Sequence, residues 1–126
     1  MSHHVLLAED DRFLRKAAET MLKRNGFTVT AAADGEEALR FARENPPDLM
    51  LLDLIMPKMQ GFDVLAALKA GPETAAIPVI VLSNLGQDSD VQLARERGAT
   101  DYIIKSNIAL ESLVERVRTF FAGRAA

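Results

Sequence analysis

The chain has 126 residues, 48% of them hydrophobic, which predicts a single domain over residues 1–126 with one core. The formal net charge is -3 with both signs interspersed, so nothing in the charge pattern favours direct binding to nucleic acid or to an anionic membrane. The chain lacks cysteine, which excludes disulfides, thiolate catalysis and cysteine-ligated zinc. It also lacks a secretory leader and a membrane-length apolar run, so we expect a soluble, cytoplasmic protein.

Short apolar runs alternate with helical patterns along the chain, which predicts a parallel α/β sheet. The predicted strands are HVLLAE (4–9), FTVTA (27–31), DLMLLD (48–53), PVIVLS (78–83) and DYIIK (101–105). The third and fourth runs are the most continuously apolar, so these strands should lie centrally.

Helical spacing of apolar residues follows each predicted strand. A first helix ends at Asn25-Gly26, and Asp34 with Glu37 forms a capping-box pattern that opens a second. A third helix runs from about Phe62 through Lys69, before Gly71-Pro72.

Two further helices are predicted in the C-terminal part of the chain. Ser89 with Gln92 gives another capping-box pattern, and the last helix is predicted to end at Gly123. Its apolar stripe consists of Leu110, Leu113, Val114, Val117 and Phe120. Alternating units in so short a chain predict an open, doubly wound sheet, because a closed eight-unit barrel would need about twice the length.

Polar side chains stand at the carboxyl ends of four predicted strands, where sheets of this class bind ligands. Glu9 and Asp10 follow the first strand, Asp53 the third, Ser83 the fourth and Lys105 the fifth. Carboxylates about 4 Å apart would repel by roughly 4 kcal/mol per pair at an effective dielectric of 20, and a bound cation would remove this conflict. Oxygen ligands without His or Cys favour Mg²⁺.

Phosphoryl transfer requires the groups that this edge would bring together. Asp53 would be the attacking oxygen, the metal and Lys105 would neutralise charge on the phosphoryl oxygens, and Ser83 would donate a hydrogen bond. Asp11 is expected only to cap the first helix. Tyr102, taken alone, is typical of half-buried packing in a sheet.

The segments that carry these residues are VLLAEDD, DLIMPKMQG, VIVLSN and GATDYIIK. Together they resemble the receiver domain of two-component response regulators, in particular the chemotaxis-regulator type, over essentially the whole chain. The D-x-x-M-P-x-M-x-G run that begins at Asp53 is highly specific for that family. The resemblance implies the flavodoxin-like (βα)5 fold with strand order 2-1-3-4-5.

The resemblance also implies roles for individual residues at the site. Asp53 would be the phosphoacceptor, Glu9 and Asp10 the acidic pair around Mg²⁺, and the backbone carbonyl of Ile55 a further metal ligand. The phosphoryl donor would be a phosphohistidine on a histidine kinase or a phosphotransfer protein.

The remaining implied roles concern the signalling switch. Lys105 would contact the phosphate, and Ser83 with Tyr102 would form the switch pair. Phosphorylation would reshape the face made by the fourth helix, fifth strand and fifth helix, where a downstream target binds, and the protein would be a monomer or a phosphorylation-dependent dimer. No turnover of an external substrate is implied.

Three departures from the family pattern stand near the site. Ser106 occupies a position that commonly holds proline after a cis bond, which would cost about 3 kcal/mol before a non-proline residue. Asn84 stands where the family usually keeps a very small residue, so it either narrows access to the phosphate or adds a hydrogen bond. Ile55 and Leu85 are apolar at positions that bear on hydrolysis, so we hypothesise that they lengthen the phosphorylated lifetime.

Three alternative functions compete with the receiver interpretation. A phosphatase of the haloacid dehalogenase type needs a second acid two residues after the nucleophile, where this chain has Ile55. A flavin-binding domain lacks its phosphate loop here, because acids follow the first strand. A receiver-like binding module that signals without phosphate, its site disabled by Asn84 or Ser106, stays open, as does the choice between a stand-alone regulator and an excised input domain.

Overall fold

The computed structural model describes residues 3–84 and 87–125 and contains one five-stranded parallel sheet in the order β2-β1-β3-β4-β5. The strands are β1 (His4–Ala8), β2 (Thr28–Ala32), β3 (Leu49–Leu52), β4 (Val79–Ser83) and β5 (Asp101–Ile104). This confirms the open, doubly wound α/β fold and its strand order. It also confirms that the third and fourth strands lie inside the sheet, where both faces are covered.

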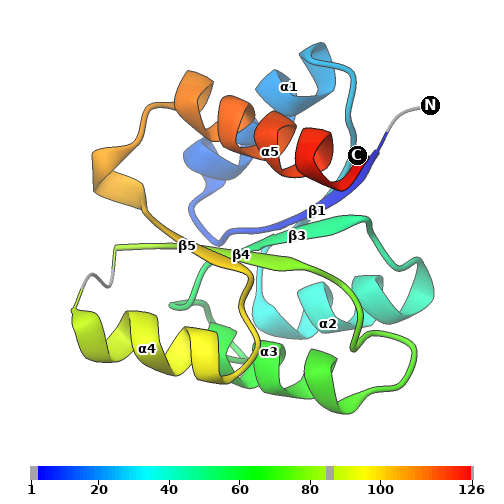
Figure 1. The fold of residues 1–126 in the computed structure, drawn as a ribbon, viewed down its shortest axis with the longest axis vertical. Helices are drawn as coiled ribbons and strands as arrows, with labels where there is room; N and C mark the ends of the chain where they lie inside the picture. Colours follow the sequence, from blue (N-terminus) through cyan, green and yellow to red (C-terminus); the bar gives the residue numbers. More distant parts are fainter. Residues whose placement is uncertain (1–2, 85–86, 126) are drawn as a thin grey trace.

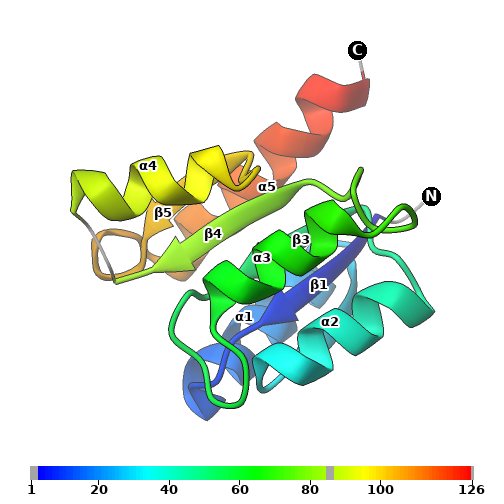
Figure 2. The same ribbon diagram turned by 90° about the horizontal axis from the view of Figure 1, so that it is seen from below.

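Helices cover both faces of the sheet. They are α1 (Arg12–Arg24), α2 (Gly35–Glu44), α3 (Gly61–Ala70), α4 (Asp88–Glu96) and α5 (Leu110–Ala125), with a short 3₁₀ helix at Lys105–Asn107. In Figure 1, α1 and α5 lie on one side of the sheet, and α2, α3 and α4 lie on the other. The view from below in Figure 2 shows these last three helices in front of the strands.

The core is divided between the two faces of the sheet because successive strand residues point to opposite sides. In β3, Leu49 and Leu51 pack towards α1 and α5, whereas Met50 and Leu52 pack towards α2, α3 and α4. All four side chains are fully buried. The sheet therefore separates the core into two halves, one on each face. Composition alone had predicted one core.

Two of the predicted helix starts are confirmed. The Asp11 side chain accepts a hydrogen bond from the Leu14 N–H at 3.0 Å and caps α1. Asp34 accepts from the Glu37 N–H at 2.8 Å and caps α2. These caps fix where each chain segment turns from the carboxyl edge of the sheet into its helix.

Two predicted helix boundaries are wrong. The capping box at Ser89 does not form, because the N-cap of α4 is Gln87, two residues earlier, and it makes no side-chain cap hydrogen bond. Asp88 and Asp90 lie in its first turn, where acidic side chains interact favourably with the helix dipole. At the other end of the chain, α5 continues through Gly123 to Ala125.

No helix in the described part of the chain is both long and apolar enough to cross a bilayer.

Candidate functional site

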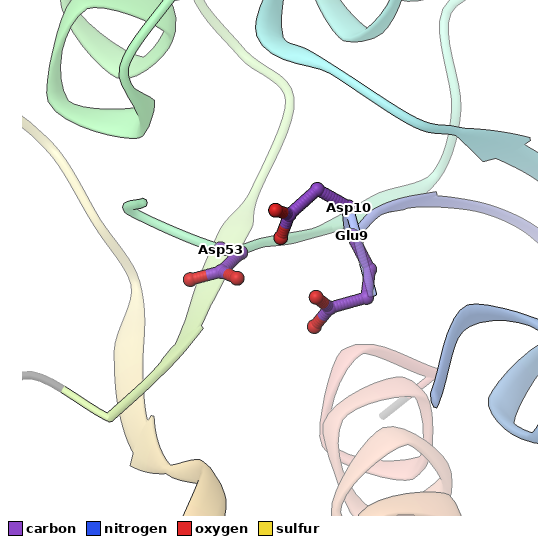
Figure 3. A group of neighbouring side chains, drawn as sticks. All are labelled: Glu9, Asp10 and Asp53. Atoms are coloured by element: carbon purple, nitrogen blue, oxygen red, sulfur yellow. The ribbon is translucent and has the colours of Figure 1, made fainter. Parts of the chain in front are cut away.

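Three carboxylates converge at the carboxyl edge of the sheet. Glu9 and Asp10 follow β1, Asp53 follows β3, and these two strands are direct neighbours. Each residue offers a carboxylate oxygen, and these oxygens lie within 4.8 Å of one another. Figure 3 shows the three side chains around one shared space. Asp10 is exposed, whereas Glu9 and Asp53 are 1% and 5% exposed, so two of these negative charges are held almost out of water.

Lys105 joins the two buried carboxylates. Its Nζ lies 2.7 Å from Glu9 Oε1 and 3.0 Å from Asp53 Oδ2. Burial alone would lower the pKa of Lys105, but the hydrogen bonds to these two carboxylates and their charges raise it above its ordinary value. Lys105 therefore carries a full positive charge at the edge of the sheet. It is the first residue of the 3₁₀ helix, not the end of the fifth strand as predicted.

The other oxygen of Asp53 faces the loop that follows β3. Asp53 Oδ1 accepts a hydrogen bond from the Ile55 N–H at 3.2 Å, and the backbone N–H of Asp53 donates to Ala8 O at 3.0 Å. Gly61 lies so close to the Asp53 carbonyl that a Cβ there would overlap it, which explains the glycine in the DLIMPKMQG segment. The Ile55 side chain is 53% exposed beside the site.

Glu9 is fixed through both its side chain and its backbone. Its Oε2 accepts a hydrogen bond from the Asp11 N–H at 3.0 Å, and its own N–H donates to Ala32 O at 3.0 Å. Burial raises the pKa of Glu9, against the lowering effect of Lys105 and the Asp11 N–H. A cation bound here would favour the ionised form that burial opposes.

Ser83 and Tyr102 lie in contact on the adjacent strands β4 and β5. Ser83 is the fully buried last residue of β4, and Tyr102 is the second residue of β5. Their side chains share a hydrogen bond, and burial raises the pKa of the Tyr102 phenol. The structure thus brings together the two residues that the sequence assigned to the switch.

The departures at Asn84 and Ser106 prove to be connected. The Ser106 N–H donates to Asn84 Oδ1 at 3.0 Å, so Asn84 gains a hydrogen bond in this structure. Across residues 3–84 and 87–125 no peptide bond is cis, so the bond before Ser106 is trans. Leu85, which was paired with Ile55 in the lifetime hypothesis, lies outside the described residues.

Sequence reasoning missed two cationic residues near the site. Arg15 donates to the backbone carbonyls of Glu9 and Asp10, and Lys58, in the loop after β3, has its Nζ 3.5 Å from Asp34 Oδ2. No sequence pattern indicated the contacts of Arg15, because its hydrogen-bond acceptors are main-chain oxygens, which every residue has. Lys58 has a positive φ of 69°, a conformation that sequence reasoning does not expect of lysine.

The donor set at this edge fits a hard divalent cation. Three carboxylates from adjacent strands supply oxygen ligands, as Mg²⁺ prefers, and the nearby ammonium group leaves part of the negative charge unbalanced. Asp53 offers this site a buried carboxylate whose oxygens could bind such a cation.

Fold and site together define a class of protein: the chain belongs to the response regulator receiver domain family, whose family model matches residues 5–118. It is a receiver domain of two-component signalling.

Among individual proteins, the chain is 41% identical over 101 residues to the transcriptional regulatory protein AfsQ1 of Streptomyces coelicolor, covering 80% of this chain and 44% of AfsQ1. The chain thus spans less than half of that relative.

Two solved structures extend the comparison. A putative response regulator from Chloroflexus aurantiacus has a TM-score of 0.86 and 31% identity, with 97% of this chain and 99% of that chain covered. The Mn²⁺-bound form of the response regulator Rcp1 has a TM-score of 0.84 and 29% identity, with 94% of each chain covered.

Proposed function

We propose that this domain accepts a phosphoryl group on Asp53 from a phosphohistidine, in a reaction that depends on Mg²⁺. One observation carries the proposal: the buried Asp53 carboxylate contacts the Lys105 ammonium group at 3.0 Å and shares its space with the carboxylates of Glu9 and Asp10. The family of the chain supports the same chemistry.

In the proposed reaction, an Asp53 oxygen forms a bond to phosphorus while the bond from phosphorus to the donor imidazole nitrogen breaks. The electron pair of that bond leaves with the imidazole. Lys105, already placed against Asp53 Oδ2, would balance the charge that gathers on the phosphoryl oxygens. Ser83 would donate a hydrogen bond to one of those oxygens.

Glu9, Asp10 and Asp53 would hold Mg²⁺, with the backbone carbonyl of Ile55 as a further proposed ligand. The bound ion would supply positive charge to the phosphoryl oxygens. The Mn²⁺ in Rcp1 supports a divalent cation site in this fold. Asp53 accepts hydrogen bonds on each oxygen, so it is oriented before either ligand arrives.

The proposed output is a conformational switch. A phosphate adds about -1.5 to -2 charge at Asp53, which would draw the Ser83 hydroxyl towards it and break the contact with Tyr102. The altered face of α4, β5 and α5 would then bind a downstream target or a second copy of the domain. The partners would be a histidine kinase or phosphotransfer protein and that effector.

Receiver domains are typically signalling modules, so no turnover of an external substrate is proposed. The lack of cysteine supports action in the cytoplasm, and residues 1–126 are proposed to form one domain.

The deciding experiment measures intact mass after incubation with a small-molecule phosphodonor, with and without Mg²⁺. We expect one phosphoryl adduct that requires Mg²⁺ and is absent in Asp53→Asn. Asp63→Asn is the matched control, because Asp63 is an exposed aspartate in the first turn of α3. No adduct under any condition would refute the proposal and favour the receiver-like binding module, with the connection between Asn84 and Ser106 as the altered feature.

A further inference from the structure

Arg15 contacts the main chain that carries two of the three carboxylates. It lies in the first turn of α1, where its N–H donates to Asp11 O at 2.8 Å. Its side chain reaches back over the helix start, and Nη1 donates to Glu9 O at 2.9 Å and to Asp10 O at 3.2 Å. One guanidinium nitrogen therefore bridges two consecutive carbonyls at the carboxyl end of β1.

The two residues that Arg15 holds differ in their other restraints. Glu9 is also held by Asp11, Ala32 and Lys105. For Asp10, the contact with Arg15 at 3.2 Å is the one polar contact that the structure gives within residues 3–84 and 87–125. The direction of the Asp10 carboxylate consequently depends on a backbone that Arg15 fixes.

The guanidinium group of Arg15 interacts with these carbonyls and, in the part of the chain that the structure describes, not with a carboxylate. Among the described residues, no carboxylate lies within the 4.0 Å ion-pair distance of its guanidinium group. A charged donor makes a stronger hydrogen bond than a neutral one, so the bridge is stiff. Arg12 offers a comparison on the same helix: it is exposed, and the described structure gives its side chain no hydrogen bond or ion pair.

We propose that Arg15 is a positioning residue for the divalent cation site: by bridging the carbonyls of Glu9 and Asp10, it holds their carboxylates in the arrangement that converges on Asp53. The proposal rests on the cation site of the proposed function. Residues that orient metal ligands typically change metal affinity by about 10–100-fold when they are replaced.

The test is isothermal titration of the intact chain with Mg²⁺ alone, for the wild type and two matched variants. Arg15→Met keeps the length of the side chain and loses both hydrogen bonds, and Arg12→Met removes the same charge from the same helix. We expect Arg15→Met to weaken Mg²⁺ binding about tenfold and Arg12→Met to change it by less than about twofold, since Arg12 is exposed and solvent and salt screen its charge. Arg15→Lys should restore part of the loss, because an ammonium group can still donate to a carbonyl.

A second readout needs no metal. Hydrogen exchange of the Asp11 amide, which donates to Glu9 Oε2 at 3.0 Å, should be faster in Arg15→Met than in Arg12→Met without Mg²⁺. A residue that supports only the general stability of the fold would lower the unfolding temperature and leave Mg²⁺ affinity unchanged.

Three results would overturn the proposal. Wild-type affinity in Arg15→Met would do so, and so would an equal loss in Arg12→Met, which would assign the effect to charge alone. If Arg15→Met does not fold, Arg15→Gln takes its place, because its shorter, neutral side chain lacks the charged donor, and wild-type affinity in that variant overturns the proposal. No Mg²⁺ binding by the wild type would instead refute the cation site of the proposed function, and the positioning role of Arg15 would then fall with that site.

Discussion

The Asp34 carboxylate connects the start of α2 to Lys58 in the loop after β3. It caps α2 by accepting from the Glu37 N–H at 2.8 Å, and Lys58 Nζ lies 3.5 Å from its other oxygen. The cap lowers the pKa of Asp34, and the charge of Lys58 lowers it further against the opposing effect of burial. Ionised Asp34 therefore stabilises the folded state.

We predict that Asp34→Asn makes the protein less stable at neutral pH but not at low pH. Asparagine keeps a capping oxygen and loses the charge, so the cost at pH 7 should be about 0.5–1 kcal/mol. The folded pKa lies below the unfolded value of about 3.9, so the contribution is present above that value and is lost as the pH falls through the folded pKa. Urea unfolding between pH 7 and 2 measures the difference, and a gap that does not change with pH would contradict the prediction.

Ile55 is the exposed apolar residue next to the proposed phosphoacceptor, with its N–H on Asp53 Oδ1. If it obstructs the attacking water, Ile55→Asn should speed loss of the phosphoryl group about fivefold, the equivalent of one net hydrogen bond of about 1 kcal/mol. Decay of the adduct, followed by intact mass, gives the rate. Phe13→Asn, which replaces another exposed apolar side chain, near the start of α1, is the control. An unchanged rate in Ile55→Asn would count against the hypothesis.

At the scale of elements, a hydrogen bond joins the connections that follow β4 and β5. Asn84 Oδ1 accepts from the Ser106 N–H, so the segment after Ser83 is tied to the segment after Lys105. Ser83 and Tyr102, the proposed switch pair, lie on the two strands whose following segments this hydrogen bond connects. Because the bond is exposed, its net contribution to stability should be about 0.5–1 kcal/mol.

A double-mutant cycle tests this connection. Asn84→Ala alone should lower stability by about 0.5–1 kcal/mol, but should have almost no effect in a Ser106→Pro background, where the donor is already missing. Denaturant midpoints of the four proteins give the coupling. Equal costs of Asn84→Ala in both backgrounds would show that the bond contributes nothing in solution.

The carboxyl-edge residues could be predicted from sequence because parallel strands place their ends at one edge, and each strand was a clear apolar run. Asp11 and Asp34 were recognisable for a similar reason, since a cap is a local pattern. Arg15 was not, because its partners are main-chain carbonyls, which leave no trace in side-chain patterns.

Helix α5 shows another limit of local patterns. Phe120 and Phe121 both follow the predicted stripe at helical spacing, and the sequence favoured Phe120 for the core. In the structure both rings belong to the core half under α1 and α5, but Phe121 is the more deeply buried, at 6% exposure, while Phe120 is half-buried and packs against that half. The choice depends on His3 and Phe27, whose rings lie 4.0 and 5.8 Å from that of Phe121 and come from distant parts of the chain.

At the scale of the whole molecule, the two halves of the core meet in β3. Leu51 belongs to the half under α1 and α5, and Leu52 belongs to the half under α2, α3 and α4. Both side chains are fully buried, and the strand ends directly before Asp53. If residues 1–126 form one domain, loss of packing on either face should destabilise both halves and the site together.

We therefore predict that Leu51→Ala and Leu52→Ala each cost about 2–5 kcal/mol and that each variant unfolds in a single transition. Far-UV circular dichroism follows the helices on both faces. Fluorescence of Tyr102, the only tyrosine in a chain without tryptophan, follows the half that contains Leu52. The two signals should coincide in both variants, and Phe13→Ala, at an exposed position, should change stability by less than about 0.5 kcal/mol. Separate transitions, with Leu52→Ala moving the tyrosine signal alone, would mean that the halves unfold independently and that the single-domain proposal is wrong.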